Sequence, residues 1–185
     1  MTGEEGGGFA REAERVVYDG HIIEVVVGTF RGPDGTTFDR DVVHHPGAVS
    51  VVPLLDDGRV VLVRQYRAPI DDWLLEIPAG IRDVDGEPPE QTARRELAEE
   101  AGYAADSVEL LISFQNSAGF SDERVDVFLA TGLTEVPLDL QGIEEQHLTI
   151  ETVALADVPD LIARGVLTDA KTVIGLLLAL RRQDA

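Results

Sequence analysis

The sequence predicts an α+β fold in which a mixed β-sheet lies between helices and a smaller β-sheet precedes it. Three observations support this prediction. Strand-like runs rich in Val, Ile, Phe and Thr occupy the first third of the chain, one strong helical segment follows at residues 88–101, and further strand-like runs lead to two closing helices. Strands interleaved with helices in this way are typical of an α/β/α sandwich.

The predicted strands are short runs that end at turn residues. Asp19-Gly20 is a hairpin signal, and Asp56-Asp57-Gly58 forms a second turn. We predict strands at residues 15–18, 21–30, 36–43, 48–55, 59–67, 108–114, 124–130 and 148–155, helices at 88–101, 157–164 and 169–182, and a polar loop at 139–147.

Length and composition indicate one main domain with a small sheet before it. The chain has 185 residues, of which 44% are hydrophobic. We expect residues 1–12 to be a flexible tail, 13–46 to form the N-terminal β-sheet region, and 47–185 to form the main domain. No apolar run approaches the roughly 20 residues that span a bilayer, and the acidic, glycine-rich start differs from a signal peptide. We therefore expect a cytoplasmic protein without a membrane partner.

The charge of the chain restricts its partners. The formal net charge is −20, which disfavours nucleic acid because phosphate backbones bind patches of Lys and Arg. Cysteine is absent, so neither a disulfide nor a thiolate metal site can form.

The strongest helical segment has clear ends and one apolar stripe. Pro88-Pro89 suits a first turn and Gly102 suits the position after the last one. Ala93, Leu97 and Ala101 are spaced i, i+4, i+8, so they lie on one face. The sequence therefore predicts a helix that buries this stripe.

Three carboxylates are crowded beside that stripe. Glu96, Glu99 and Glu100 lie at the C-terminal end of the helix, where the dipole disfavours anions. Like charges at i, i+4 also cost roughly 0.2–0.5 kcal/mol per pair. The simplest alternative is a solvated acidic face. A divalent cation would compensate both costs, and hard oxygen ligands favour Mg²⁺ or Mn²⁺ over zinc.

The spacing around these glutamates forms a longer motif. Gly80 is followed by six residues, Glu87, seven residues, and then Arg95-Glu96-Leu97-Ala98-Glu99-Glu100-Ala101-Gly102-Tyr103. This pattern resembles the Nudix box, which has Gly, five residues, Glu, seven residues, and Arg-Glu-apolar-x-Glu-Glu-x-Gly-apolar. The extra residue falls in a turn-rich loop at 82–86, where an insertion leaves the helix register unchanged.

Flanking segments resemble one branch of the Nudix superfamily. Residues 62–69, 73–80 and 119–123 are similar to the ADP-ribose pyrophosphatases, and family-like features extend from about Tyr18 to Leu180. One position departs from this branch, because Ala118 stands where a proline is usual.

The resemblance implies a fold, a reaction and an assembly. It implies a Nudix-like α/β/α sandwich, with the N-terminal sheet of residues 13–46 in a homodimer interface. It also implies that Mg²⁺, or alternatively Mn²⁺, assists hydrolysis of the diphosphate in a nucleoside diphosphate derivative, foremost ADP-ribose to AMP and ribose 5-phosphate. The alternatives are another nucleotide-sugar diphosphatase, a hydrolase of oxidised nucleotides, a nucleotide sensor without activity, and an acidic helix in an interaction module.

The matching box also implies residue roles. Glu96 and Glu100 are the first expected metal ligands, Glu99 is expected to bridge, and the carbonyl of Ala79 is a further expected ligand. Arg95 is expected to orient a glutamate through a charge-assisted hydrogen bond.

A general base is expected in the acidic loop after the box. Similar enzymes supply the base from such a loop, and Glu144 is favoured here with Glu145 second. The alternative for this pair is a solvated surface loop.

Four further residues are candidates for substrate recognition. Arg67 can pair with a phosphate, and Glu76 can bond ribose hydroxyls or a base edge. Trp73 and Phe120 can stack on a base, with a place in the core as the alternative.

Overall fold

The computed structural model describes residues 8–140, 143 and 145–183. The chain divides into two units. The first comprises the chain up to Pro46 together with Gln115–Arg124, and the second comprises Gly47–Phe114 together with the chain from Val125 onward.

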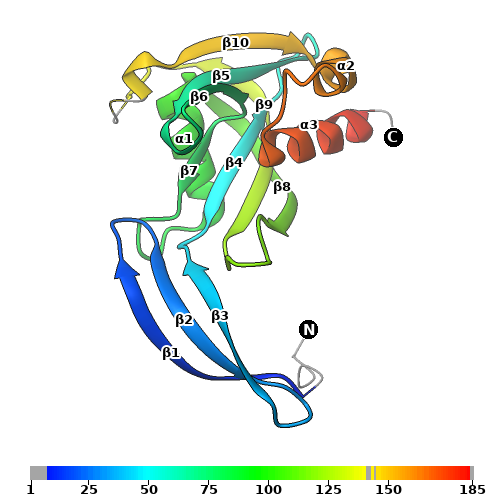
Figure 1. Ribbon diagram of the computed structural model, residues 1–185. Coiled ribbons are helices and arrows are strands. Elements are labelled where there is room, and N and C mark those ends of the chain that lie inside the picture. The colour runs from blue at the N-terminus through cyan, green and yellow to red at the C-terminus, as the bar shows by residue number, and fades with distance from the viewer. Residues whose placement is uncertain (1–7, 141–142, 144, 184–185) are drawn as a thin grey trace. The chain divides into compact units, whose positions relative to one another are not determined.

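The first unit is built on a three-stranded antiparallel sheet in the order β1-β2-β3 (Figure 1). Its strands are β1 (Ala10–Asp19), β2 (Glu24–Arg31) and β3 (Thr37–His44). The turn between β1 and β2 is closed by the N–H of Gly20, which donates to the carbonyl of Ile23 at 2.9 Å. The predicted hairpin is therefore present, although β1 begins earlier and β2 later than the sequence pattern predicts.

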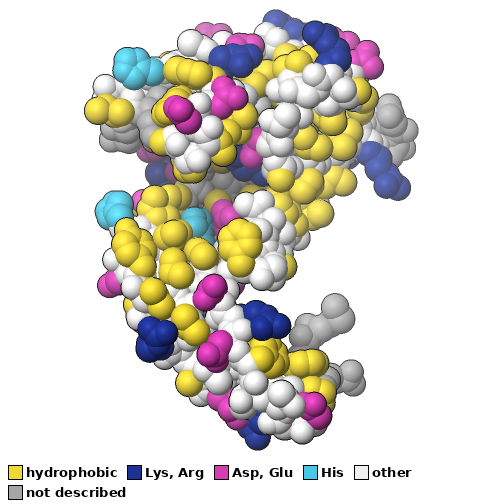
Figure 2. Space-filling view, viewed as in Figure 1, with side chains coloured by type: hydrophobic (Ala, Val, Ile, Leu, Met, Phe, Trp, Pro, Cys, Tyr) yellow, Lys and Arg dark blue, Asp and Glu magenta, His cyan; other side chains and the backbone are white. Residues whose placement is uncertain are grey.

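Large hydrophobic side chains remain exposed on this sheet. Figure 2 shows hydrophobic side chains gathered over part of it. The exposed hydrophobic residues on β1 and in the turn after it are Val16, Val17, Tyr18 and Ile22.

The segment 115–124 joins the first unit by pairing with the end of β3. The N–H of Val43 donates to the carbonyl of Phe120 at 2.8 Å, and Val43 also forms a parallel bridge with Ser121. His44 Nδ1 lies 2.5 Å from Asp122 Oδ2. Burial of the imidazole opposes protonation, but the hydrogen bond to Asp122 outweighs it and raises the pKa of His44.

The second unit contains two sheets. One has the order β7-β4-β9-β8, in which β4 runs parallel to β9 and antiparallel to β7. The other is antiparallel with the order β10-β5-β6. The strands are β4 (Ala48–Pro53), β5 (Arg59–Arg67), β6 (Asp72–Glu76), β7 (Ala79–Ile81), β8 (Tyr103–Gln115), β9 (Arg124–Glu135) and β10 (Thr149–Ala154). The predicted mixed sheet is confirmed.

The helical segments are α1 (Pro89–Ala101), α2 (Val158–Ala163) and α3 (Ala170–Gln183), with short 3₁₀ turns η1 (Ala68–Ile70), η2 (Glu145–His147) and η3 (Leu155–Asp157). The three helices agree with the predicted ones to within a few residues. No helix in the described part of the chain is long and apolar enough to cross a membrane.

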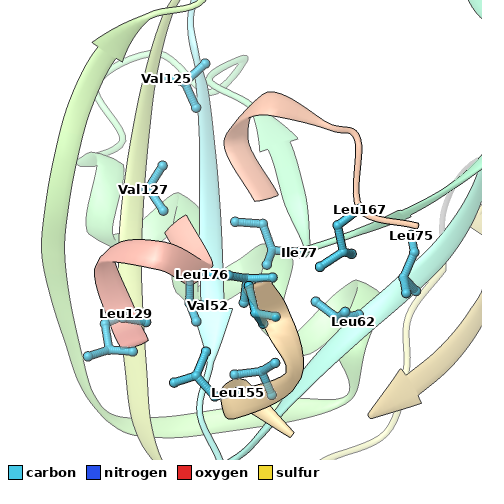
Figure 3. Close-up of a cluster of buried hydrophobic side chains, with 13 residues drawn as sticks. Val52, Leu62, Leu75, Ile77, Val125, Val127, Leu129, Leu155, Leu167 and Leu176 are labelled. Atoms are coloured by element: carbon cyan, nitrogen blue, oxygen red, sulfur yellow. The ribbon is translucent and has the colours of Figure 1, made fainter. Parts of the chain in front are cut away.

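Neighbouring residues of the central strands face two different cores. Val49 and Val51 of β4 belong to the cluster that contains Ala93 and Leu97 of α1. Val52 belongs instead to the cluster formed with α2 and α3. In that second cluster Leu176 of α3 lies beside Val52 and Ile77 (Figure 3). Because opposite faces of the strands are buried under different helices, the second unit is an α/β/α sandwich, as the sequence predicts.

Candidate active site

Helix α1 places two glutamates of the box motif in buried positions. Pro89 occupies its first position, and Gly102, with φ 72°, ends it by donating to the carbonyl of Ala98 at 3.1 Å. Because the apolar stripe of the helix is buried, the two glutamates beside it, Glu96 and Glu100, are buried as well. Glu96 is only 8% exposed and Glu100 only 4% exposed.

Strand β7 meets these two carboxylates with its backbone. The N–H of Ala79 donates to Glu100 Oε2 at 2.9 Å. A Cβ atom on Gly80 would lie 2.0 Å from the carboxyl carbon of Glu96. The box glycine is therefore required because a carboxylate occupies the place that any side chain at position 80 would take.

Burial gives both carboxyl groups unusually high proton affinity. Burial raises the pKa of Glu96 to about 7, with the nearby charges of Glu99 and Glu145 adding to the shift and Arg95 opposing it. Burial likewise raises the pKa of Glu100 to about 8, against the hydrogen bond from Ala79 and with the charges of Glu96 and Glu145 adding to the shift. Two neighbouring acids with raised pKa values are typical of a site that binds a cation or transfers a proton.

Arg95 lies among several acidic groups at this end of the unit. Its Nη1 is 2.8 Å from Glu96 Oε1 and 3.3 Å from Glu99 Oε2. Its Nη2 is 3.5 Å from carboxylate oxygens of both Asp83 and Glu87. This geometry fits a guanidinium that orients the box glutamates.

The donor set fits a hard divalent cation. Carboxylate oxygens from α1 and the backbone of β7 are brought together, and the raised pKa values show that the ionised forms lack full compensation. Within the described residues, no three Asp, Glu or His side chains form a complete ligand group by themselves. Mg²⁺ commonly binds to one or two carboxylates and takes its other ligands from water and substrate phosphates, so these residues are suited to it.

The structure describes only one of the two candidates for the general base. Glu144 lies outside the described residues. Glu145 begins the 3₁₀ turn η2, and its charge raises the pKa of both Glu96 and Glu100. The acidic loop after the box therefore brings Glu145 into the electrostatic neighbourhood of the box carboxylates.

Arg67 and Glu76 are paired with each other. Arg67 Nε and Nη2 each donate to a different oxygen of Glu76 at 2.8 Å, and Lys171 donates to Glu76 Oε2 from α3. Glu76 is 1% exposed. Among these groups, the partly exposed guanidinium is thus better placed than the carboxylate to meet a substrate. Lys171 was not a candidate from the sequence, because one lysine at the start of a helix resembles a surface residue.

The two aromatic candidates belong to different units. Trp73 is an exposed residue of β6, and its ring packs edge to face against Tyr66 at a centroid distance of 5.9 Å. Phe120 is also exposed, in the segment that joins the first unit.

Comparison with known proteins gives consistent results. Residues 44–174 match the NUDIX domain family. An ADP-ribose pyrophosphatase of Bacillus subtilis is 38% identical over 86% of both chains. A methanol dehydrogenase activator of Bacillus methanolicus is 36% identical over 86% of both chains. An ADP-ribose pyrophosphatase of Mycobacterium tuberculosis is 37% identical over 91% of this chain and 82% of its own.

The fold is also similar to a solved structure. The crystal structure of an ADP compounds hydrolase superposes with a TM-score of 0.83, covering 98% of this chain and 97% of the other at 21% identity. At that identity the likeness concerns the fold alone.

Proposed function

The chain belongs to the NUDIX domain family, and we propose from that premise that this Nudix hydrolase is a divalent-metal-dependent diphosphatase acting chiefly on ADP-ribose. The products would be AMP and ribose 5-phosphate. Two relatives that are 37% and 38% identical carry the name ADP-ribose pyrophosphatase, which supports this choice of substrate.

One observation carries the proposal. Glu96 and Glu100 are buried carboxylates of one helix, held against the backbone at Ala79 and Gly80, with pKa values of about 7 and about 8. Burying two carboxylates side by side lowers the free energy of unfolding when no cation is present. A bound cation compensates their charge and offsets this loss. An acidic helix with only a structural role does not explain why the carboxylates are buried.

Glu96 and Glu100 are proposed to hold the ion, with Glu99 and the carbonyl of Ala79 as further ligands. Mg²⁺ is the proposed ion and Mn²⁺ the alternative. When bound, it neutralises charge on the diphosphate and makes water more acidic.

The remaining residues bind, orient and transfer a proton. Arg95 holds Glu96 and Glu99 in place through its guanidinium. Glu144, or else Glu145, accepts the proton of the attacking water as it forms a bond to phosphorus and the bridging oxygen leaves. Arg67 is proposed to contact a phosphate and Trp73 the base, while base stacking by Phe120 stays a prediction from the sequence.

The residue at position 118 supports a second class of substrate. Ala118 stands where the ADP-ribose branch usually has a proline, so another nucleoside diphosphate sugar is the main alternative. Oxidised nucleotides form a third class.

A substrate panel tests the proposal. The protein is incubated with Mg²⁺ and ADP-ribose, GDP-mannose, other nucleoside diphosphate sugars, dinucleoside polyphosphates or oxidised nucleotides, and the products are separated and quantified. We expect the highest kcat/KM for ADP-ribose, with AMP and ribose 5-phosphate in equal amounts. A higher kcat/KM for another compound would reassign the substrate, and no hydrolysis of any compound would overturn the proposed function.

A further inference from the structure

Lys171 has an unusual environment for a lysine. It is the only lysine among the 15 Lys and Arg residues of the chain. Its side chain is 14% exposed, and its ammonium contacts Glu76 Oε2 and lies 3.0 Å from Asp169 Oδ2. A lysine on a helix surface normally keeps its ammonium in water, so the placement of Lys171 between two carboxylates requires an explanation.

The first of those carboxylates is almost completely enclosed. Burial alone would raise the pKa of Glu76, but the hydrogen bonds from Arg67 and the charge of Lys171 outweigh it and lower the pKa to about 2. The carboxylate is therefore ionised at neutral pH. Arg67 binds it from β5 and Lys171 binds it from α3, so one carboxylate joins two cations that come from different elements.

The start of α3 is fixed to the same place by hydrogen bonds in which Lys171 takes no part. Asp169 Oδ2 accepts hydrogen bonds from the N–H of Thr172 at 2.9 Å and from its hydroxyl at 2.6 Å. The same hydroxyl accepts the N–H of Ile77, the residue after Glu76, at 3.0 Å. The backbone that carries Lys171 is thus held next to Glu76 by hydrogen bonds other than the ion pair between Lys171 and Glu76.

Arg67 is the most exposed member of this group. Its side chain is 37% exposed, whereas that of Glu76 is 1% exposed. Its partner Glu76 lies three residues before Ala79, whose N–H donates to Glu100 Oε2 at 2.9 Å, so the guanidinium is tied to the chain segment that contacts the box carboxylates. Glu76 engages Nε and Nη2, so the outer edge of the guanidinium still presents donors in the fork geometry that suits a phosphate.

We propose that Lys171 is a positioning residue that acts through Glu76 to hold Arg67 in the orientation that binds a phosphate of the diphosphate substrate. The inference rests on the proposed diphosphatase function. Without the ammonium, the buried Glu76 Oε2 loses its second donor, and the guanidinium, which already bonds both oxygens, is expected to shift further toward Oε2 and away from the orientation that binds a phosphate. Part of the binding free energy of the substrate would then be spent on reorienting Arg67, which raises KM.

A double-mutant cycle tests this coupling. KM and kcat are measured for Lys171→Met, Arg67→Met and the double variant with the diphosphate that the wild type hydrolyses best. We expect Lys171→Met to raise KM about tenfold with kcat changed by less than about twofold, and to add almost nothing in the Arg67→Met background. Independent, multiplicative effects would overturn the inference, as would a lower melting temperature with KM unchanged.

A matched control lies on the same strand. Arg64 of β5 forms a more exposed ion pair with Glu151 of β10, with Nε 2.6 Å from Oε1. Arg64→Met removes a cation from β5 without touching Glu76, so KM and kcat should stay at the wild-type values.

A second measurement requires neither turnover nor a folded Lys171→Met variant. Because the chain contains one lysine, ¹⁵N-lysine labelling gives a single ammonium signal in NMR spectra. We expect ADP to shift this signal in the wild type and to leave it unchanged in Arg67→Met. An ammonium signal of the wild type that does not respond to bound ADP would overturn the inference, whichever substrate the panel selects.

Discussion

The pKa of one buried glutamate of this chain is lowered and the pKa values of two others are raised, because their surroundings differ. Glu76 has two cationic partners and a pKa of about 2. Glu96 and Glu100 are buried beside further carboxylates, and their pKa values are about 7 and about 8. Residue type alone does not separate these roles. The number of cations that reach each carboxylate does, and that number depends on the fold.

The raised pKa values predict how metal binding depends on pH. The folded-state pKa values of Glu96 and Glu100 exceed the ordinary value of 4.5, so the folded protein binds more protons than the unfolded chain between these values. Without metal, their contribution to the free energy of unfolding should fall as the pH rises from about 4.5 to about 8. Mg²⁺ needs the ionised forms, so its stabilising effect should grow over the same range.

Thermal unfolding with and without Mg²⁺ measures this linkage. The gain in Tm should be larger at about pH 8 than at about pH 5.5, and the double variant Glu96→Gln, Glu100→Gln should show neither gain. Equal gains at both pH values in the wild type would contradict the assignment of these two glutamates as ligands.

Among the secondary structure elements, sequence reasoning worked best where the pattern is local. Helix α1 was predictable because Pro89 begins it, Gly102 ends it and an apolar stripe runs along it. Strands β6 and β7 were not predicted, since β7 has only three residues and neither strand shows a clear alternation.

Contacts between residues far apart in the chain could not be predicted from the sequence pattern. Lys171 meets a carboxylate 95 positions away in the chain, and neither residue signals the other. Residues 115–124 join the first unit through the bridge from Ser121 to Val43, which depends on the tertiary fold.

The acidic loop between β9 and β10 supplies a prediction about the general base. If Glu144 is the general base, Glu144→Gln should lower kcat by about 10²-fold or more with KM nearly unchanged. If Glu145 is the base, Glu145→Gln will show that pattern and Glu144→Gln will resemble the wild type. Full activity in both variants and in the double variant would exclude this loop as the source of the base and turn attention to Glu99.

At the scale of the whole molecule, the formal net charge of −20 coexists with a site for an anionic substrate. Arg95 contacts Glu96, and the charge of Arg67 lowers the pKa of Glu100, so two guanidinium groups lie near the box carboxylates. Together with a divalent cation, these side chains can reverse the local field while the rest of the surface stays acidic.

The exposed hydrophobic side chains of β1 support a prediction about assembly. Val16, Val17 and Tyr18 leave an apolar surface that a monomer would expose to water. We propose that a second copy of the chain covers it in a homodimer. Light scattering at micromolar concentration should give twice the 20.0 kDa mass of the chain, and Val17→Asp should shift the mass toward one copy. A monomeric wild type would contradict this proposal.

The most direct test of the account compares wild type with Glu100→Gln in Mg²⁺-dependent cleavage of ADP-ribose. The substitution keeps an oxygen to accept the N–H of Ala79 but removes the charge. We predict that the wild type releases AMP and ribose 5-phosphate only when a divalent cation is added. We further predict that Glu100→Gln folds and loses at least about 10²-fold in kcat, since metal assistance contributes several kcal/mol. Cleavage that is independent of metal, or equal in both proteins, would contradict the central claim that these buried carboxylates hold the catalytic ion.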